Sequence, residues 1–453
     1  MRPSETNRHG PACFDVEDRY FSAMLVDHLS DVERRVLAFI DESRVTHRLG
    51  ALLRIPSVSG TAAENDAQRW LEREMREEGL TTDLWDIPLA ETMSHPDFPG
   101  VEVERSAALG LVGSFGRGKG PVLVLNGHID VVPPGDLRQW IAGDAYSGEL
   151  REGAVHGRGA CDMKGGLMAC LEAVAAVRRA GIDLRGRVLL ESVVGEEDGG
   201  LGTFATLQRG YRGDAAIIPE PTDLAIIPAC AGALTFRLAF TGRATHASVR
   251  REGVSVLDKF WLVWRALDEL EKRRNTKKDP LFERFELPFP LNVGTLRAGE
   301  WPSSVPDRLV CEGRIGVALG ETVGDTRMDL ERTIAEVCAS DAWLRENPVT
   351  VEWFGGQFAS GHIASDHALV GLVSSAHVAQ SGALVDPPQV HGAPYGSDLR
   401  LMVGLGHIPT LHYGPGNVKN AHAPNEHVPC DQLLTVTRSL VLSILRFCEP
   451  ELT

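Results

Sequence analysis

The sequence predicts an α/β fold, in which a mixed sheet with helices on both faces is interrupted by an inserted α+β layer. Strand-like apolar runs alternate with helical periods in the first half of the chain. A block in the middle follows the order βαββαβ, and mixed patterns return toward the C-terminus. The chain has 453 residues, beyond the size at which one core usually splits, so we expect two domains.

In the first half, we expect buried strands at 122–127, 187–194 and 215–218, and helices at 163–181 and 201–210. Strands that alternate with helices in this way imply a parallel or mixed sheet whose two faces are both covered.

The middle block predicts a smaller sheet with two helices on one face, which is the ferredoxin-like arrangement. Its expected elements are strands at 234–242, 291–297, 308–315 and 349–354 and helices at 253–273 and 323–339. The domain assignment that follows is a mobile extension at 1–20, a discontinuous domain at 21–231 and 358–453, and an inserted domain at 232–357.

The overall charge excludes several classes of partner. A formal net charge of −16 argues against nucleic acid and anionic membrane surfaces, because both need a basic protein face. The sequence has neither an apolar run of about 18–20 residues, which a membrane span needs, nor an apolar N-terminal segment typical of a secretory signal. We therefore expect a cytoplasmic protein that acts on a small molecule.

Polar side chains follow the three strands predicted in the first half. His128 and Asp130 follow the first strand, Glu196 and Glu197 follow the second, and Glu220 follows the third. Ligands of open α/β sheets bind outside the carboxyl ends of the strands, so we expect these side chains to share one rim.

The spacing of His128 and Asp130 suits a metal site, because a carboxylate can accept the free ring N–H of a metal-bound imidazole and fix its tautomer. A histidine that only completes the structure is the alternative for an isolated motif of this kind.

Three further motifs have a chemical and a structural interpretation. Asp162 lies in GRGACDMKGG, where it either binds cations or caps the following helix. Glu196 and Glu197 lie in the glycine-flanked GEEDGG, either as metal ligand and proton carrier or as an exposed acidic pair. His422 lies in GPGNVKNAHAPNEHV, which by itself also fits a surface loop.

Taken together, NGHIDVVP, GRGACDMKGG, GEEDGG, PEPT and NAHAPNEHV resemble the co-catalytic zinc family of acetylornithine deacetylase, succinyl-diaminopimelate desuccinylase, aminoacylases, carboxypeptidases and dipeptidases. The motifs have the family's order and span most of the chain. The resemblance implies a zinc-exopeptidase-like catalytic domain with an inserted lid or dimerisation domain, and a homodimer.

The resemblance also implies residue roles. Asp162 would bridge two divalent ions, with His128 and Glu220 completing one site and Glu197 and His422 the other. These ligands suit Zn²⁺, with Co²⁺ or Mn²⁺ as alternatives.

Two further catalytic roles come from the same resemblance. Glu196 would be the general base, and His246, in GRATHAS, would reach the partner subunit's active site to stabilise the oxyanion.

The implied reaction is hydrolysis of the amide bond of a small N-acetyl, N-succinyl or N-formyl amino acid or amine by activated water. A dipeptidase or carboxypeptidase and a non-catalytic binding paralogue are the alternatives. Candidate substrate contacts are Asn292, Arg314 and Arg400, with a structural hydrogen-bonding role as the favoured alternative for Asn292 and Arg400. Gly316 stands where many relatives carry a carboxylate-binding arginine. Either Arg314 replaces that arginine, or the enzyme does not recognise a substrate carboxylate in the usual way.

Overall fold

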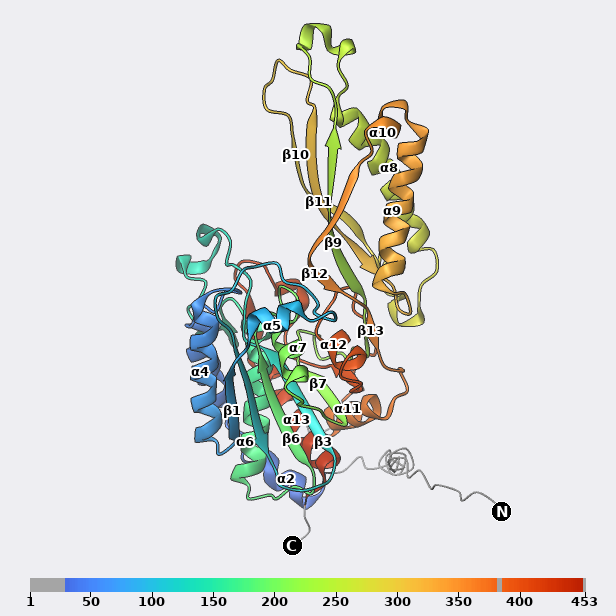
Figure 1. Cartoon of the computed structure of the whole chain (residues 1–453). Coiled ribbons are helices and arrows are strands. Elements are labelled where there is room, and N and C mark those ends of the chain that lie inside the picture. The colour runs from blue at the N-terminus through green and yellow to red at the C-terminus, as the bar shows by residue number, and fades with distance from the viewer. Residues whose placement is uncertain (1–28, 381–384, 451–453) are drawn as a thin grey trace, which may run out of the picture.

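The computed structural model describes residues 29–380 and 385–450, so the extension expected at 1–20 lies outside the described residues. The described chain forms a larger α/β unit and a smaller unit that projects from it (Figure 1). The fold class expected from the sequence is confirmed, with one mixed sheet and one inserted antiparallel sheet.

The larger unit is built on a six-stranded sheet of order β1-β2-β6-β3-β7-β14. Its strands are Thr81–Asp86 (β1), Leu109–Phe115 (β2), Val122–His128 (β3), Arg187–Val193 (β6), Ala215–Ile218 (β7) and Thr410–His412 (β14). β6, β3, β7 and β14 are parallel to one another, whereas β1 and β2 add an antiparallel edge that the sequence analysis did not predict. Three predicted strands therefore lie side by side in the centre of the sheet.

Helices cover both faces of this sheet. They are Asp31–Leu37 (α2), Glu42–Leu53 (α3), Ala62–Glu77 (α4), Leu89–Ser94 (α5), Gly165–Arg179 (α6), Leu201–Gln208 (α7), Ala368–Ala379 (α11), Leu399–Gly404 (α12) and Cys430–Cys448 (α13). Alternate side chains of β3 point to opposite faces. Leu123 and Leu125 pack in the core that contains α3, α4, α6 and α13, and Val124 packs with α7 and α12.

The projecting unit has a four-stranded antiparallel sheet of order β10-β11-β9-β12 with α8 and α9 packed beside it (Figure 1). Its elements are Gly232–Thr241 (β9), Val256–Arg274 (α8), Leu291–Ala298 (β10), Arg308–Val317 (β11), Val323–Ser340 (α9), Ala342–Glu346 (α10) and Thr350–Phe358 (β12). Apart from the short α10, they follow the predicted βαββαβ order. The inward-facing residues of β9 alternate with outward-facing ones, as in a sheet covered on one face.

Two small sheets join distant loops near the strand ends. One pairs Ala229–Cys230 (β8) with Gly361–His362 (β13), and the other has the order β15-β5-β4, formed by His427–Pro429, Ala154–His156 and Glu149–Arg151. Within the described ranges, every helix is too short or too polar to cross a membrane.

Candidate metal centre and active site

The parallel strands bring the predicted ligands to one edge of the large sheet. His128 ends β3 and pairs in register with Val193, the last residue of β6. Glu196 and Glu197 lie in the loop after β6, and Glu220 follows β7, which pairs with β3 on its other side. The expected convergence of these side chains therefore follows from strand order.

The ring of His128 is buried and has a defined orientation. Its Nδ1 donates a hydrogen bond to the backbone carbonyl of Asp130 at 2.9 Å, so Nε2 is the ring nitrogen that faces the other side chains of the cluster. That Nε2 lies 3.0 Å from Oδ1 of Asp162 and 4.0 Å from Oε2 of Glu220.

Asp130 contacts both the ring of His128 and the loop that carries Glu196 and Glu197. Its carboxylate lies 3.8 Å from the ring of His128, which is instead oriented by the Asp130 main chain. The carboxylate accepts hydrogen bonds from the Ser59 hydroxyl at 2.8 Å and from the backbone N–H groups of Glu196 and Glu197 at 3.3 and 3.4 Å. Asp130 thus holds the acidic loop in place as well as the histidine.

Asp162 lies in a tight turn, Ala160–Lys164, immediately before α6. The helix begins after Lys164, and Asp162 does not cap it, so the capping alternative does not describe this residue. Oδ1 of Asp162 faces His128, and Oδ2 lies 3.4 Å from Nε2 of His422. The two oxygens are therefore directed at two different histidines.

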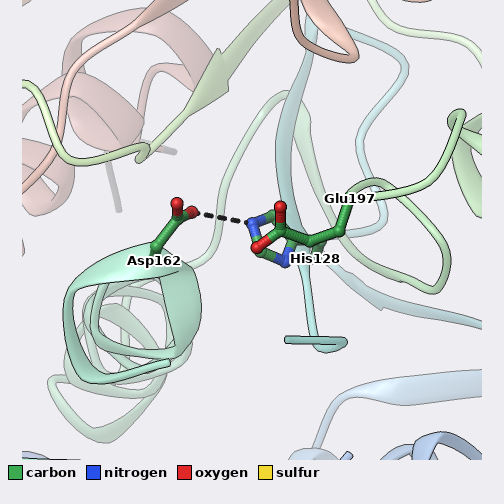
Figure 2. A group of neighbouring side chains, drawn as sticks. All are labelled: His128, Asp162 and Glu197. Atoms are coloured by element: carbon green, nitrogen blue, oxygen red, sulfur yellow. Dashed lines mark hydrogen bonds and ion pairs between the residues drawn. The ribbon is translucent and has the colours of Figure 1, made fainter. Parts of the chain in front are cut away.

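His422 reaches the same cluster from the opposite end of the chain. Its Nε2 lies 3.1 and 3.0 Å from the two carboxylate oxygens of Glu197. Figure 2 shows Asp162, His128 and Glu197 converging from the turn before α6, the end of β3 and the loop after β6. All five predicted ligands thus belong to one connected cluster.

The spacing of the ligand atoms suits divalent metal ions. Two ligands about 2.0–2.2 Å from a tetrahedral ion lie about 3.4 Å from each other, and the contacts above span 3.0–4.0 Å. Atoms of His128, Asp162 and Glu197 lie within 4.8 Å of one another, as do atoms of His128, Glu196 and Glu220. The donor set of imidazoles and carboxylates therefore fits divalent cations.

The electrostatics of the cluster also favour bound cations. Burial, reinforced by neighbouring carboxylates, raises the pKa values of Glu196 and Glu220 well above the usual range. Burial opposes the charged form of His128, but Asp162 and Glu220 outweigh it and raise its pKa well above the usual value. Asp162 and Glu197 raise the pKa of His422 to about 11. So many buried negative groups in one place are costly unless positive charge compensates them.

The predicted substrate contacts lie in different environments. Arg400 is buried, stacks 3.9 Å above the Phe358 ring, and donates to the carbonyls of Ser397 and Gly199. Arg314 is half exposed and lies 3.8 Å from Glu102, which therefore neutralises part of its charge.

The remaining candidates lie on the projecting sheet. Asn292 is exposed on β10 and pairs in register with Arg314. Gly316 has no room for a side chain, because a Cβ there would lie 2.8 Å from the backbone of Phe289.

His246 lies away from the ligand cluster in this chain. β9 runs away from the large sheet (Figure 1), and His246 follows its last residue, Thr241. The His246 ring is exposed and contacts the hydroxyl of Ser248 at 2.7 Å.

Sequence reasoning missed a buried ion-pair network that supports the acidic loop. Arg105 makes two 2.7 Å contacts with Asp198 and two 3.1 Å contacts with Glu64. Asp198 comes directly after Glu197 in the chain. The acidic loop is therefore held at two points, by Asp130 at the amides of Glu196 and Glu197 and by Arg105 at the carboxylate of Asp198. Arg105 and Asp198 are 93 residues apart, and no local motif marks their pairing.

The α/β sheet and its cluster of imidazoles and carboxylates define the class of metal-dependent hydrolases with an inserted second domain. Residues 124–446 match Peptidase family M20/M25/M40, and the chain belongs to that family. The family resemblance expected from the motifs and the assignment as an amide hydrolase are thereby confirmed.

Curated relatives and solved structures agree with this membership. The chain is 28% identical over 442 residues to the N-formyl-4-amino-5-aminomethyl-2-methylpyrimidine deformylase of Halalkalibacterium halodurans, covering 93% of this chain and 98% of the relative. It is 28% identical over 400 residues to the succinyl-diaminopimelate desuccinylase of Gluconacetobacter diazotrophicus, covering 85% and 92%. Human carnosine dipeptidase 1 shares the fold with a TM-score of 0.70 at 16% identity, covering 93% and 99%.

Proposed function

We propose that this enzyme removes a small acyl group from the nitrogen of an amine, using two divalent ions that we take to be Zn²⁺. Asp162 would be shared by the two ions, His128 and Glu220 would hold one of them, and Glu197 and His422 would hold the other. The observation that carries this proposal is the direction of the two Asp162 oxygens, each toward a different histidine.

The chain's own groups have complementary roles in this reaction. Bound cations supply Lewis acidity toward the amide carbonyl and acidify a water molecule. Glu196 accepts the proton of the attacking water and delivers it to the departing nitrogen. Burial raises the pKa of Glu196 above the usual carboxyl range, which is the direction that favours uptake of a proton by this side chain. Asp130 holds the backbone of Glu196 for this task.

The surroundings argue against a carboxylate-bearing succinyl group, and between the uncharged formyl and acetyl groups we favour formyl because a relative is named as a deformylase. A carboxylate-bearing substrate needs a free cationic partner. Arg314 lies close to Glu102, and Arg400 already donates hydrogen bonds to backbone carbonyls, so neither arginine is free in this way. Gly316 leaves no space for another arginine. The relative from Halalkalibacterium halodurans is named as a deformylase, and this chain covers almost all of it.

The enzyme acts as a homodimer through the projecting unit, in which His246 completes the partner's site. The exposed position of His246 supports this arrangement, because the residue lies away from the cluster of its own chain. β10 is an edge strand, and α8 exposes Leu257, Trp261 and Leu262. Exposed apolar patches and open sheet edges are typical of association surfaces. The cytoplasmic location expected from the sequence stays a prediction.

A substrate panel tests the reaction. Zinc-loaded enzyme is assayed with N-formyl, N-acetyl and N-succinyl derivatives of the same amines and with dipeptides. We expect the highest kcat/KM for a formylated amine, loss of activity after dialysis against a chelator, and recovery with Zn²⁺. Preference for a succinyl amide would contradict the acyl assignment, and preference for dipeptides would favour the peptidase alternative.

A further inference from the structure

The carboxylate of Glu426 joins the two segments that carry Asp162 and His422. Its side chain is fully buried. One oxygen, Oε1, accepts three backbone hydrogen bonds, from Gly159 at 3.0 Å, Cys161 at 2.9 Å and Asp162 at 3.0 Å. A single oxygen thus accepts hydrogen bonds from three backbone amides of the turn that contains Asp162.

The second oxygen of Glu426 has a separate partner. It accepts a 2.5 Å hydrogen bond from the guanidinium of Arg158, whose side chain is also buried. Arg158 lies over the Trp140 ring, with 5.2 Å between the guanidinium carbon and the ring centroid. Arg158 therefore compensates the charge of the carboxylate and limits its movement.

The main chain connects the same segments independently of this carboxylate. β15 pairs with β5, and the carbonyl of Glu426 accepts the N–H of Gly157 at 2.9 Å. These contacts end before Asp162. The side chain of Glu426 extends the connection by one turn, to the amide of Asp162 itself.

We infer that Glu426 is a positioning residue that sets the distance between Asp162 and His422, and thereby the geometry of both proposed metal sites. This inference rests on the proposed ligand set. Groups that orient metal ligands typically change metal affinity by about 10–100-fold when they are replaced. A purely structural carboxylate would change the stability of the fold and leave the metal affinity of folded protein unchanged.

The Glu426→Gln variant separates these two roles. Glutamine keeps an oxygen for the three amides, but its NH₂ group then faces the guanidinium of Arg158, so donor opposes donor. A movement of the turn that relieves this conflict shifts Asp162 relative to His422.

Glu172→Gln is the matched control. Glu172 is also a buried carboxylate that accepts a backbone N–H, from Asp41 at 2.9 Å, and pairs with an arginine, Arg179. It lies on α6, the helix that follows the Asp162 turn. This control undergoes the same chemical change without touching the turn.

The experiment titrates Zn²⁺ and Co²⁺ into metal-free full-length protein, measures both dissociation constants against a competing chelator, and records thermal unfolding in parallel. We expect Glu426→Gln to weaken metal binding about 10–100-fold and to alter the visible spectrum of bound Co²⁺, and Glu172→Gln to retain wild-type affinity. Arg158→Lys, a milder change, should weaken binding in the same direction.

Wild-type metal affinity and Co²⁺ spectra in both Glu426→Gln and Arg158→Lys would overturn the inference, even if thermal stability falls. If Glu426→Gln does not fold, the result for Arg158→Lys decides. Failure of the wild-type protein to bind two ions would instead refute the proposed metal centre.

Discussion

Asp162 shows how single side chains can determine the chemistry of the centre. Its two oxygens face His128 and His422, which come from segments almost 300 residues apart in the chain. The neighbouring carboxylates then accumulate negative charge that two imidazoles alone do not balance. The side chains that would bind the cations therefore also carry the buried negative charge that bound cations would compensate.

A second buried carboxylate, Glu191 on β6, affects the stability of the fold. Burial raises its pKa to about 7, and its Oε2 accepts a 3.0 Å hydrogen bond from the amide of Asn126. The unfolded side chain ionises near pH 4.3. Between these pH values the native state keeps a proton that the unfolded state has lost, so the free energy of unfolding falls as pH rises through this window.

We predict that Glu191→Gln gains stability relative to wild type as pH rises from 5 to 9. The uncharged amide retains an oxygen for Asn126 and removes an ionisation penalty of up to about 4 kcal/mol, which follows from a pKa of about 7 in the folded state and about 4.3 in the unfolded chain. Urea unfolding at the two pH values measures the difference. An equal stability difference at pH 5 and pH 9 would refute the raised pKa of Glu191.

At the scale of secondary-structure elements, sequence patterns predicted the parts that depend on local periodicity. The strand predicted at 215–218 matches β7, and the helix predicted at 323–339 matches α9 within one residue. The ligands at the strand ends could be predicted for the same reason, because a strand fixes where its last side chain lies.

The rest of the site depends on partners that are distant in sequence. The small sheet of β15, β5 and β4 joins three-residue strands that are too short to show an alternating pattern. Arg105 and Glu426 act on loops 93 and more than 260 residues away, and no local spacing marks those contacts. Arg400 was a candidate either for substrate contact or for a structural hydrogen-bonding role, and its guanidinium donates to backbone carbonyls, a pairing that no residue pattern encodes.

We predict that Arg105→Gln loosens the loop that carries Glu196. Removing the guanidinium leaves the carboxylates of Glu64 and Asp198 buried without compensation, a loss of about 3–5 kcal/mol in the free energy of unfolding. Small displacements of a catalytic group can cost about 100-fold in rate, so kcat should also fall. Denaturant unfolding and kcat per metal-loaded, folded enzyme are the measurements.

Arg274→Gln is the control for this prediction. Arg274 is likewise buried and joins two acidic residues, Glu321 at 2.6 Å and Asp329 at 3.2 Å, but it lies in the projecting unit. It should lose stability while the folded enzyme keeps its kcat. A fall in kcat of equal size in both variants would mean that the effect of Arg105 is not specific to the acidic loop.

At the scale of the whole molecule, the two units divide the catalytic groups. The large sheet carries the proposed ligands and Glu196, whereas His246 lies beyond the end of β9 on the projecting unit. In a twofold dimer formed through that unit in which one His246 reaches the other subunit's cluster, the second His246 does so equally, because a twofold interface repeats the same contacts on both subunits. The site of a single chain would then be incomplete.

Mixing two inactive variants tests this division. Glu196→Gln should lower turnover by about 10²–10⁴-fold while retaining metal, because only the proton carrier is lost, and His246→Ala should be inactive with Glu196 intact. In a heterodimer, the site with a native Glu196 receives a native His246 from its partner. With random exchange of equal amounts, half of the dimers are mixed and each has one complete site, so activity should recover to about a quarter of wild type. Subunit exchange confirmed by mass spectrometry without any recovery would place the action of His246 within its own chain or outside catalysis.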